Sequence, residues 1–288
     1  MNRSVLLIAS VCSVVIACGP GNRNGNGSGS DVDGGSNSGD GGQQGCGGLT
    51  NCFSVYAHSN DTLYVVDLQT KTLQTIGKFN TSTHENITDL AVAPDDTIYV
   101  ISNTTLFTAD KTTGATTKVG SLSACGSQGV ALTTMPNGDI WEGDFSGKLC
   151  KIDISSMPPT VGAPVTMSNN LALSGDLVAV DDGTVFGTAY KLSDGSGMGT
   201  QLSNVLVTIQ VATGATTMVG ATGFPKLFGV SYALGSVIGF THDGTGHVIQ
   251  IDRMTGTATM FATFMDPSTN QPISFAGAGV NSKVSVIQ

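Results

Sequence analysis

The chain has 288 residues, of which only 11% are charged, and its 21 acidic and 12 basic side chains give a formal net charge of −9. A negatively charged molecule repels nucleic acid and anionic lipid headgroups, so this composition excludes nucleic-acid binding. The length allows one sizeable hydrophobic core or two modest ones.

Residues 1–17 predict a signal peptide. Arg3 is followed by an uninterrupted run of apolar or small residues from Val5 to Ala17. Such a run is too short to span a bilayer, which takes about 20 residues, and it is typical of a signal-peptide core. We therefore expect the protein to act outside the cytoplasm.

The residues that end this run, Val15–Cys18 (VIAC), resemble the lipobox of bacterial lipoproteins. The resemblance implies cleavage before Cys18 and attachment of fatty acids such as palmitate to it. Gly19 follows the cysteine where inner-membrane lipoproteins have Asp, which implies the outer membrane or cell surface as the location. Several acyl chains anchor a protein stably where one would not. An ordinary secretory signal with an incidental cysteine is the alternative.

Residues 18–48 predict a flexible linker. Thirteen glycines and almost no apolar residue lie between Gly19 and Gly48. Such a segment cannot bury enough apolar surface to offset the entropy lost on ordering it. We expect one folded domain over residues 49–288.

A repeated phrase runs through that domain. TTGATTKVG at residues 112–120 returns as ATGATTMVG at residues 212–220, and related segments begin at Asp67, Asp110, Asp153, Gln210 and Asp252, at intervals of 43, 43, 57 and 42 residues. Repeats of about 40 to 45 residues built from short alternating strands are typical of β-propeller blades. The sequence thus predicts an all-β fold in which the repeated phrase is the outer hairpin of each blade.

Counting strands predicts five blades. Inner strands are expected to begin near Ile87, Gln128, Ser174, Leu227 and Ser274. The first blade lacks an inner strand of its own, and residues 274–280 can supply it, which would close the ring and leave no open edge. The extra strand expected at residues 283–288 would either displace residues 53–59 or lie beside them, and it leaves six blades as the alternative.

The strands TLYVVD and TIYVIS and the D-x-x-T-G turns resemble the extracytoplasmic bacterial propellers with YVTN- or PQQ-like repeats. That class includes quinone-dependent dehydrogenases, lyases, lactonases, lectins and scaffolds, so the resemblance implies a fold and not a function. Quinoprotein repeats carry a tryptophan in each blade, whereas this chain has only Trp141. We expect no quinone and no other cofactor.

Four cysteines remain after processing at Cys18. An even number in an oxidising compartment favours disulfides. Cys125 and Cys150 fall at the same end of the third blade and are expected to pair, while Cys46 and Cys52 would join the linker to the first strand. Free thiols are the alternative.

Candidate ligand-binding residues lie in loops on one face. His84, Glu85 and Asp89 belong to a connection into the second blade, and His242 and Asp243 to a turn of the fifth. A solvated loop is the simpler interpretation of the first group, and a hairpin turn at Asp243-Gly244 is that of the second. An insertion at residues 191–204 falls on the same face, where it marks either a binding face or a surface insertion without a role.

No metal site, nucleophile elbow, HExxH helix or P-loop is predicted from the sequence. Three functional classes remain. The first is a tethered module that binds a glycan or protein partner, the second is a lyase or lactonase acting in the channel, and the third is a structural component of the cell envelope.

Overall fold

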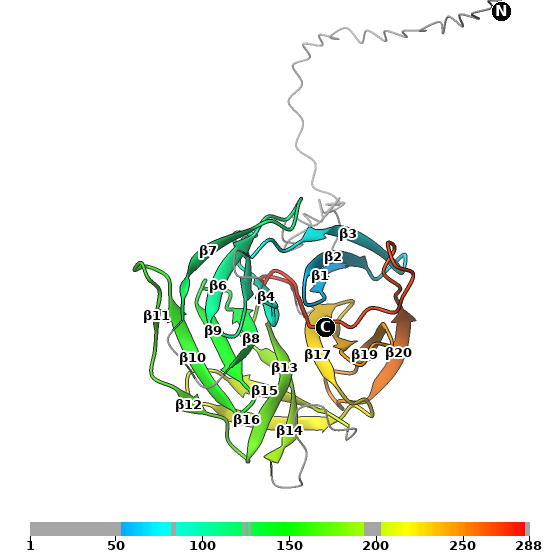
Figure 1. Ribbon diagram of the computed structural model, residues 1–288. Helices are drawn as coiled ribbons and strands as arrows, with labels where there is room; N and C mark the ends of the chain where they lie inside the picture. The colour runs from blue at the N-terminus through cyan, green and yellow to red at the C-terminus, as the bar shows by residue number, and fades with distance from the viewer. Residues whose placement is uncertain (1–52, 82–84, 123–124, 126–127, 193–202, 286–288) are drawn as a thin grey trace, which may run out of the picture. The chain divides into compact units, whose positions relative to one another are not determined.

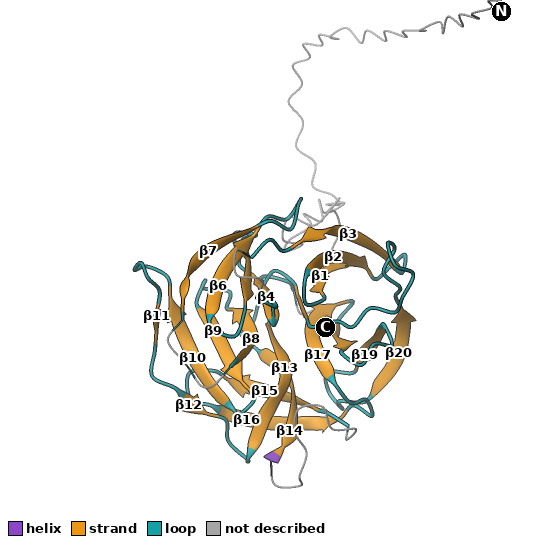
Figure 2. Ribbon diagram, in the orientation of Figure 1, coloured by secondary structure: helices purple, strands orange, loops and turns teal. Residues whose placement is uncertain are grey.

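The computed structural model describes residues 53–81, 85–122, 125, 128–192 and 203–285. Five antiparallel sheets surround one axis (Figure 1), and Figure 2 shows only a short helical turn at Leu192 besides strands and loops. None of the described residues belongs to a helix long and apolar enough to cross a membrane. The fold is a five-bladed β-propeller, which confirms the sequence-based prediction over its six-bladed alternative.

Each blade runs from an inner strand at the axis to an outer strand at the rim. Blade 1 contains β21 (Gly277–Gly279), β1 (Ser54–His58), β2 (Thr62–Asp67) and β3 (Thr72–Lys78). Blade 2 contains β4 (Asp89–Val92), β5 (Ile98–Ile101), β6 (Thr105–Ala109) and β7 (Thr116–Ser121). Blade 3 contains β8 (Gly129–Thr134), β9 (Ile140–Asp144), β10 (Lys148–Asp153) and the short β11 (Thr160–Val161) and β12 (Val165–Thr166). Blade 4 contains β13 (Leu171–Ala179), β14 (Val185–Lys191), β15 (Val205–Gln210) and β16 (Ala215–Ala221). Blade 5 contains β17 (Leu227–Ala233), β18 (Ser236–Thr241), β19 (His247–Ile251) and β20 (Ala258–Thr263).

The position of a strand in its blade explains its residue pattern. Every residue of the inner strands β4, β8 and β13 is buried, because their neighbours are the inner strands of the adjacent blades. The outer strands β3 and β7 are mostly exposed or half-buried, and they carry threonine and lysine. The hydrophobic core therefore lies between neighbouring blades, around the axis.

The C-terminal strand closes the ring as expected. β21 pairs antiparallel with β1, with Gly279 opposite Tyr56 and Gly277 opposite His58. The prediction that residues 283–288 form a further strand is wrong for the part that the structure describes. Residues 283–285 form no strand, β1 keeps its place between β21 and β2, and the carbonyl of Val284 accepts the N–H of Asp181 at 3.1 Å.

The repeated hairpin turn is fixed by its aspartate and its glycine. Asp110 Oδ1 accepts the N–H groups of Thr112 and Thr113 at 2.9 and 2.8 Å. Gly114 then has φ of +73°, a left-handed conformation that glycine adopts without a steric penalty. The local geometry thus accounts for the first half of the repeated phrase.

Contacts between blades account for the second half of the phrase. A Cβ on Gly77, at the end of one blade's outer strand, would lie 2.0 Å from the carbonyl oxygen of Thr113 in the next blade's turn. A Cβ on Gly220 would likewise lie 2.0 Å from the carbonyl oxygen of Thr255. The glycine that ends the phrase therefore makes room for the neighbouring turn.

The third blade departs from the pattern. Its outer strand is divided into β11 and β12, which both pair with β10, where a single strand was expected. Gly162 and Pro164 lie between the two segments. Proline lacks an N–H for the strand ladder, so the outer strand is interrupted there.

Candidate functional site

A pocket of about 250 Å³ lies at the axis and is lined by residues from all five blades. Its walls come from turns between second and third strands, from connections between blades, and from the inner strands at Val130, Gly175 and Phe228. Both sets of loops share one face, as the sequence predicted. The lining residues are Asn60, Asn86, Ile87, Thr88, Asn103, Gln128, Val130, Phe145, Gly175, Phe228, His242 and Ala276.

Four side-chain amides face this pocket without protein partners. Within the described part of the chain, none of the four makes a hydrogen bond to another protein group; they are Asn60, Asn86, Asn103 and Gln128. Two buried asparagines elsewhere are bound into the fold. Asn204 Oδ1 accepts the N–H of Leu227 at 2.8 Å, and Asn281 Nδ2 donates to the carbonyl of Ala93 at 3.0 Å. The pocket amides are therefore available to a ligand.

Three rings form one wall of the pocket, from the inner strand β17 and from turns of blades 3 and 5. Phe228 and His242 are parallel, with centroids 4.6 Å apart, and Phe145 lies 6.3 Å from Phe228 at a tilt of 51°. His242 Nδ1 is 2.8 Å from the carbonyl oxygen of Phe275, which can only accept, so Nδ1 carries the proton. This tautomer leaves Nε2 as an acceptor.

Two buried carboxyl groups lie at the axis beneath the pocket. Asp89 accepts the N–H groups of Leu90 and Leu132 at 2.8 and 2.6 Å. Asp176 accepts three more, each from a further blade. Their donors are Leu177 at 2.5 Å, Val230 at 2.8 Å and Ala278 at 3.0 Å. Every blade thus donates one inner-strand N–H to this pair.

Burial raises the pKa of both Asp89 and Asp176 well above the ordinary value, and each carboxyl group also interacts with the other. Two carboxylates close together in a desolvated site cannot both ionise easily, so the pair retains a proton. With their oxygens accepting backbone N–H groups, these side chains join the blades. The pair was not predicted as a unit, although the repeated Asp-Leu in two apolar inner strands was a signal for it.

His58 is also buried next to this pair. Its Nδ1 lies 2.7 Å from the carbonyl oxygen of Ser59, while Nε2 has no hydrogen-bond partner. Burial lowers the pKa of His58 to about 4, so the ring is neutral at physiological pH. A Cβ on Gly277 would lie 2.2 Å from Asp89 Oδ1 and 2.4 Å from His58 Nε2, so only glycine leaves these two side chains their positions.

The sequence-predicted site residues separate into different roles. His242 lines the pocket, whereas Asp89 lies fully buried beneath it and does not line its mouth. Glu85 faces an adjacent groove and accepts a hydrogen bond from Ser102 Oγ. Asp243 is exposed and accepts the N–H of Thr245 within its own turn. His84 and most of the insertion at residues 191–204 lie outside the described residues.

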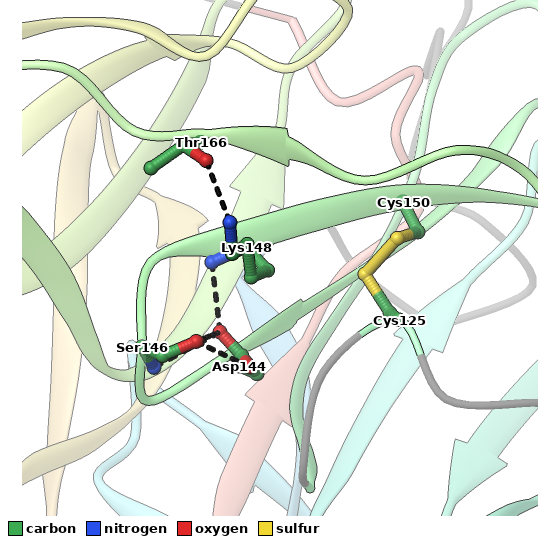
Figure 3. The surroundings of a disulfide bond; sticks show 6 residues. All are labelled: Cys125, Asp144, Ser146, Lys148, Cys150 and Thr166. Carbon is green, nitrogen blue, oxygen red and sulfur yellow. Dashed lines mark hydrogen bonds between the residues drawn. A yellow bond between two sulfur atoms is a disulfide. The ribbon is translucent and has the colours of Figure 1, made fainter.

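The expected disulfide between Cys125 and Cys150 is present, with an S–S distance of 2.04 Å (Figure 3). It joins the connection into blade 3 to β10. The turn before β10 is held separately by Asp144, whose Oδ1 accepts the N–H of Lys148 at 2.7 Å. Cys18, Cys46 and Cys52 lie outside the described residues.

Glu142 is buried beside this disulfide. Its carboxylate and the two sulfur atoms lie within 4.8 Å of one another, but both sulfurs are in the disulfide and offer no thiolate to a metal. Burial raises the pKa of Glu142 to about 7.

Two open grooves of about 440 and 430 Å³ adjoin the axial pocket and share Asn60 and Asn86 with it. A larger groove, of about 690 Å³, lies on the opposite face beside Asp182 and Thr213. It is open and borders only blades 3 and 4, whereas the axial pocket combines five blades. We therefore take the axial pocket as the candidate site.

No protein-family model and no curated protein matches the chain. Among solved structures, virginiamycin B lyase from Staphylococcus aureus is 13% identical and covers 77% of this chain and 73% of its own, with a TM-score of 0.42. A putative 6-phosphogluconolactonase from Bacteroides fragilis is 10% identical, covering 80% and 98%, with a TM-score of 0.47. The nidogen/laminin complex is 15% identical, covering 80% and 98%, with a TM-score of 0.46. These similarities carry no functional inference.

Proposed function

We propose that this protein is an extracytoplasmic binding module that is tethered to the membrane through Cys18 and holds its ligand in the axial pocket. The observation that carries the proposal is the convergence of four unbonded side-chain amides from separate loops on one concave site. Concave sites with a few convergent polar groups and apolar walls are typical of ligand binding. The anchor, the linker and the outer-membrane location rest on the N-terminal sequence.

The buried ionisable groups favour binding over lyase or lactonase chemistry. A base or nucleophile must reach the substrate, but Asp89 and Asp176 are fully buried and accept five backbone N–H groups. We therefore assign these two side chains a structural role, in which they hold the inner strands together. The ligand is a glycan or a segment of a partner protein, as the sequence suggested.

The binding role is tested by thermal denaturation of the full chain with a panel of glycans, peptides and divalent metals. A ligand that binds only the folded state raises the melting temperature. We expect one class to do so, and the double variant Asn60→Ala/Asn103→Ala to lose the effect. Gln74→Ala, which removes an exposed amide from the outer strand β3, should keep it. A purely structural envelope component would respond to none of the probes.

The anchor is tested separately by Cys18→Ser in cells given labelled fatty acid. We expect the variant to carry no label and to keep its signal peptide, because lipid attachment and cleavage both require the cysteine of the lipobox. Label on the variant would contradict the lipoprotein assignment and would leave the pocket proposal untouched.

A further inference from the structure

The axial pocket has a chemical character that narrows its ligand further. Its lining contains four carboxamides, one threonine hydroxyl, three rings and small apolar groups, and no lysine, arginine, aspartate or glutamate. A charged ligand buried here would lose its hydration without gaining an ion pair, which is costly. The ligand group that enters the pocket is therefore uncharged.

The charge of the protein is a second reason why an anionic ligand group is disfavoured in the pocket. The whole chain carries a net charge of −9. Phosphate, sulfate and carboxylate groups would approach this negative potential with no cation to receive them.

The inner strands offer no edge to a peptide. A peptide that adds to a sheet needs free backbone N–H and C=O groups along a strand. At the axis, one N–H from each inner strand is already bound by Asp89 or Asp176, including those of Leu132 and Ala278. The pocket is also compact, at about 250 Å³, below the roughly 300–1,000 Å³ of sites for drug-sized ligands. A single ring fits this volume.

The remaining features describe a ring with both hydroxyl and C–H surfaces. Carboxamides donate and accept hydrogen bonds at once, which suits adjacent hydroxyl groups. The wall of Phe145, Phe228 and His242 offers apolar ring surface to C–H groups, and His242 Nε2 offers one more acceptor. Asn60 and Asn86 continue from the pocket into the two adjoining grooves, where a second unit of the ligand would lie.

We propose that the axial pocket binds one neutral sugar ring, at the end of a longer glycan that leaves across Asn60 and Asn86. The inference rests on the proposed binding function and specifies its ligand. In this arrangement, the four amides form hydrogen bonds with the sugar hydroxyls. The aromatic wall packs against the sugar ring.

The test is isothermal titration calorimetry on the purified full chain with three sets of probes. The first set contains neutral trisaccharides of glucose, galactose, mannose and N-acetylglucosamine. The second contains the sulfated or uronate forms of the same sugars, and the third is a library of pentapeptides. The variants are Asn103→Ala, which removes an unbonded amide, Phe228→Leu, which keeps apolar bulk without the ring, and Gln74→Ala as the matched control.

We expect a neutral trisaccharide to bind, Asn103→Ala and Phe228→Leu each to weaken it about three- to tenfold, and Gln74→Ala to leave it unchanged. If a charged sugar or a peptide binds best and the pocket variants weaken it, the neutral-sugar inference is overturned while the binding function stands. If no probe binds, or if binding ignores the pocket variants, the binding function itself fails.

Discussion

Asp89 and Asp176 show at the residue scale how two side chains can hold five blades together. They accept one backbone N–H from the inner strand of each blade, and both are fully buried. Losing either acceptor leaves buried N–H groups without a partner, at a cost of about 1–3 kcal/mol for each group. The pair is thus a connection shared by all five sheets, in addition to hydrogen bonds that join only two neighbouring blades, such as that of Thr134 Oγ1 to the carbonyl of Val92 at 2.7 Å.

The pair also makes stability depend on pH with a definite sign. Its folded pKa is raised above the value of about 3.9 for an unfolded aspartate, so above that pH the folded state binds more protons than the unfolded state. This contribution to stability is complete below about pH 4 and is lost as the pH rises through the folded pKa. The pKa of His58 is lowered to about 4, so its contribution to stability is instead lost as the pH falls below about 6.5. The pKa of Glu142 is raised to about 7, so its contribution is lost as the pH rises to about 7.

Asp89→Asn separates the pair from those other groups. The free energy of unfolding of the variant should be about 1–3 kcal/mol lower at pH 5. The reason is that its side-chain NH₂ group would face one of the backbone N–H groups whose hydrogen bond Asp89 accepts. The difference in the free energy of unfolding between the two proteins should shrink as the pH rises. Only the unsubstituted protein has the full carboxyl pair, whose contribution to stability is lost over this range. Chemical denaturation of both proteins between pH 5 and 9 measures this difference. A constant difference across the range would contradict the shared-proton account.

At the scale of elements, the glycine near the end of the repeated phrase leaves room for the turn of the next blade. Gly220 is the next-to-last residue of the outer strand β16, and the turn of blade 5 comes so close that a Cβ on Gly220 would lie 2.0 Å from the carbonyl oxygen of Thr255. The ring's final junction uses a different contact. Lys71, with φ of +55°, replaces the turn glycine, and its Nζ lies 4.6 Å from the centroid of the Phe261 ring.

Gly220→Ala should therefore destabilise the protein by about 1–3 kcal/mol, because the added methyl group pushes the neighbouring turn away. Gly162→Ala is a matched control at the corresponding position of blade 3, where the nearest atom to a Cβ is 3.4 Å away. We expect thermal unfolding to show a clear loss for the first variant and little change for the second. Equal effects would mean that the contact between blades does not explain the repeat.

The sequence predicted the elements better than the site. Hairpins, blade count and closure follow from local turn chemistry and from repeat spacing, both of which are written along the chain. The pocket residues Asn60, Asn103 and Gln128 belong to separate polar loops that look like ordinary solvated turns. Only closure of the ring brings them together, so no local pattern distinguishes them. Asp89 was noticed, but its partner Asp176 lies 87 positions further along the chain, in another blade.

Closure by the C-terminal strand determines the stability of the whole molecule. β21 supplies the inner strand of blade 1, fully buried and paired to β1, and Ala278 also donates to Asp176. Phe275, which is fully buried, precedes β21 and packs against Phe240 of blade 5, with ring centroids 5.1 Å apart. The strand therefore connects the first blade to the fifth.

Truncation after Pro272 should open the ring. The free edge of β1 and the exposed core would lead to aggregation or unfolding, and no stable smaller protein should form. Size-exclusion chromatography and thermal denaturation of the truncated chain check this outcome. A soluble monomer with a near-native melting temperature would show that blade 1 is complete without β21.

The claim that the axial pocket is the binding site is tested most directly by NMR on the ¹⁵N-labelled full chain titrated with the neutral trisaccharides. We predict that the side-chain NH₂ resonances of Asn60, Asn86, Asn103 and Gln128 shift together at one saturating concentration, while that of Gln74 stays in place. Shifts confined to residues of the opposite groove, such as Gln210, or an unchanged spectrum, would contradict the account.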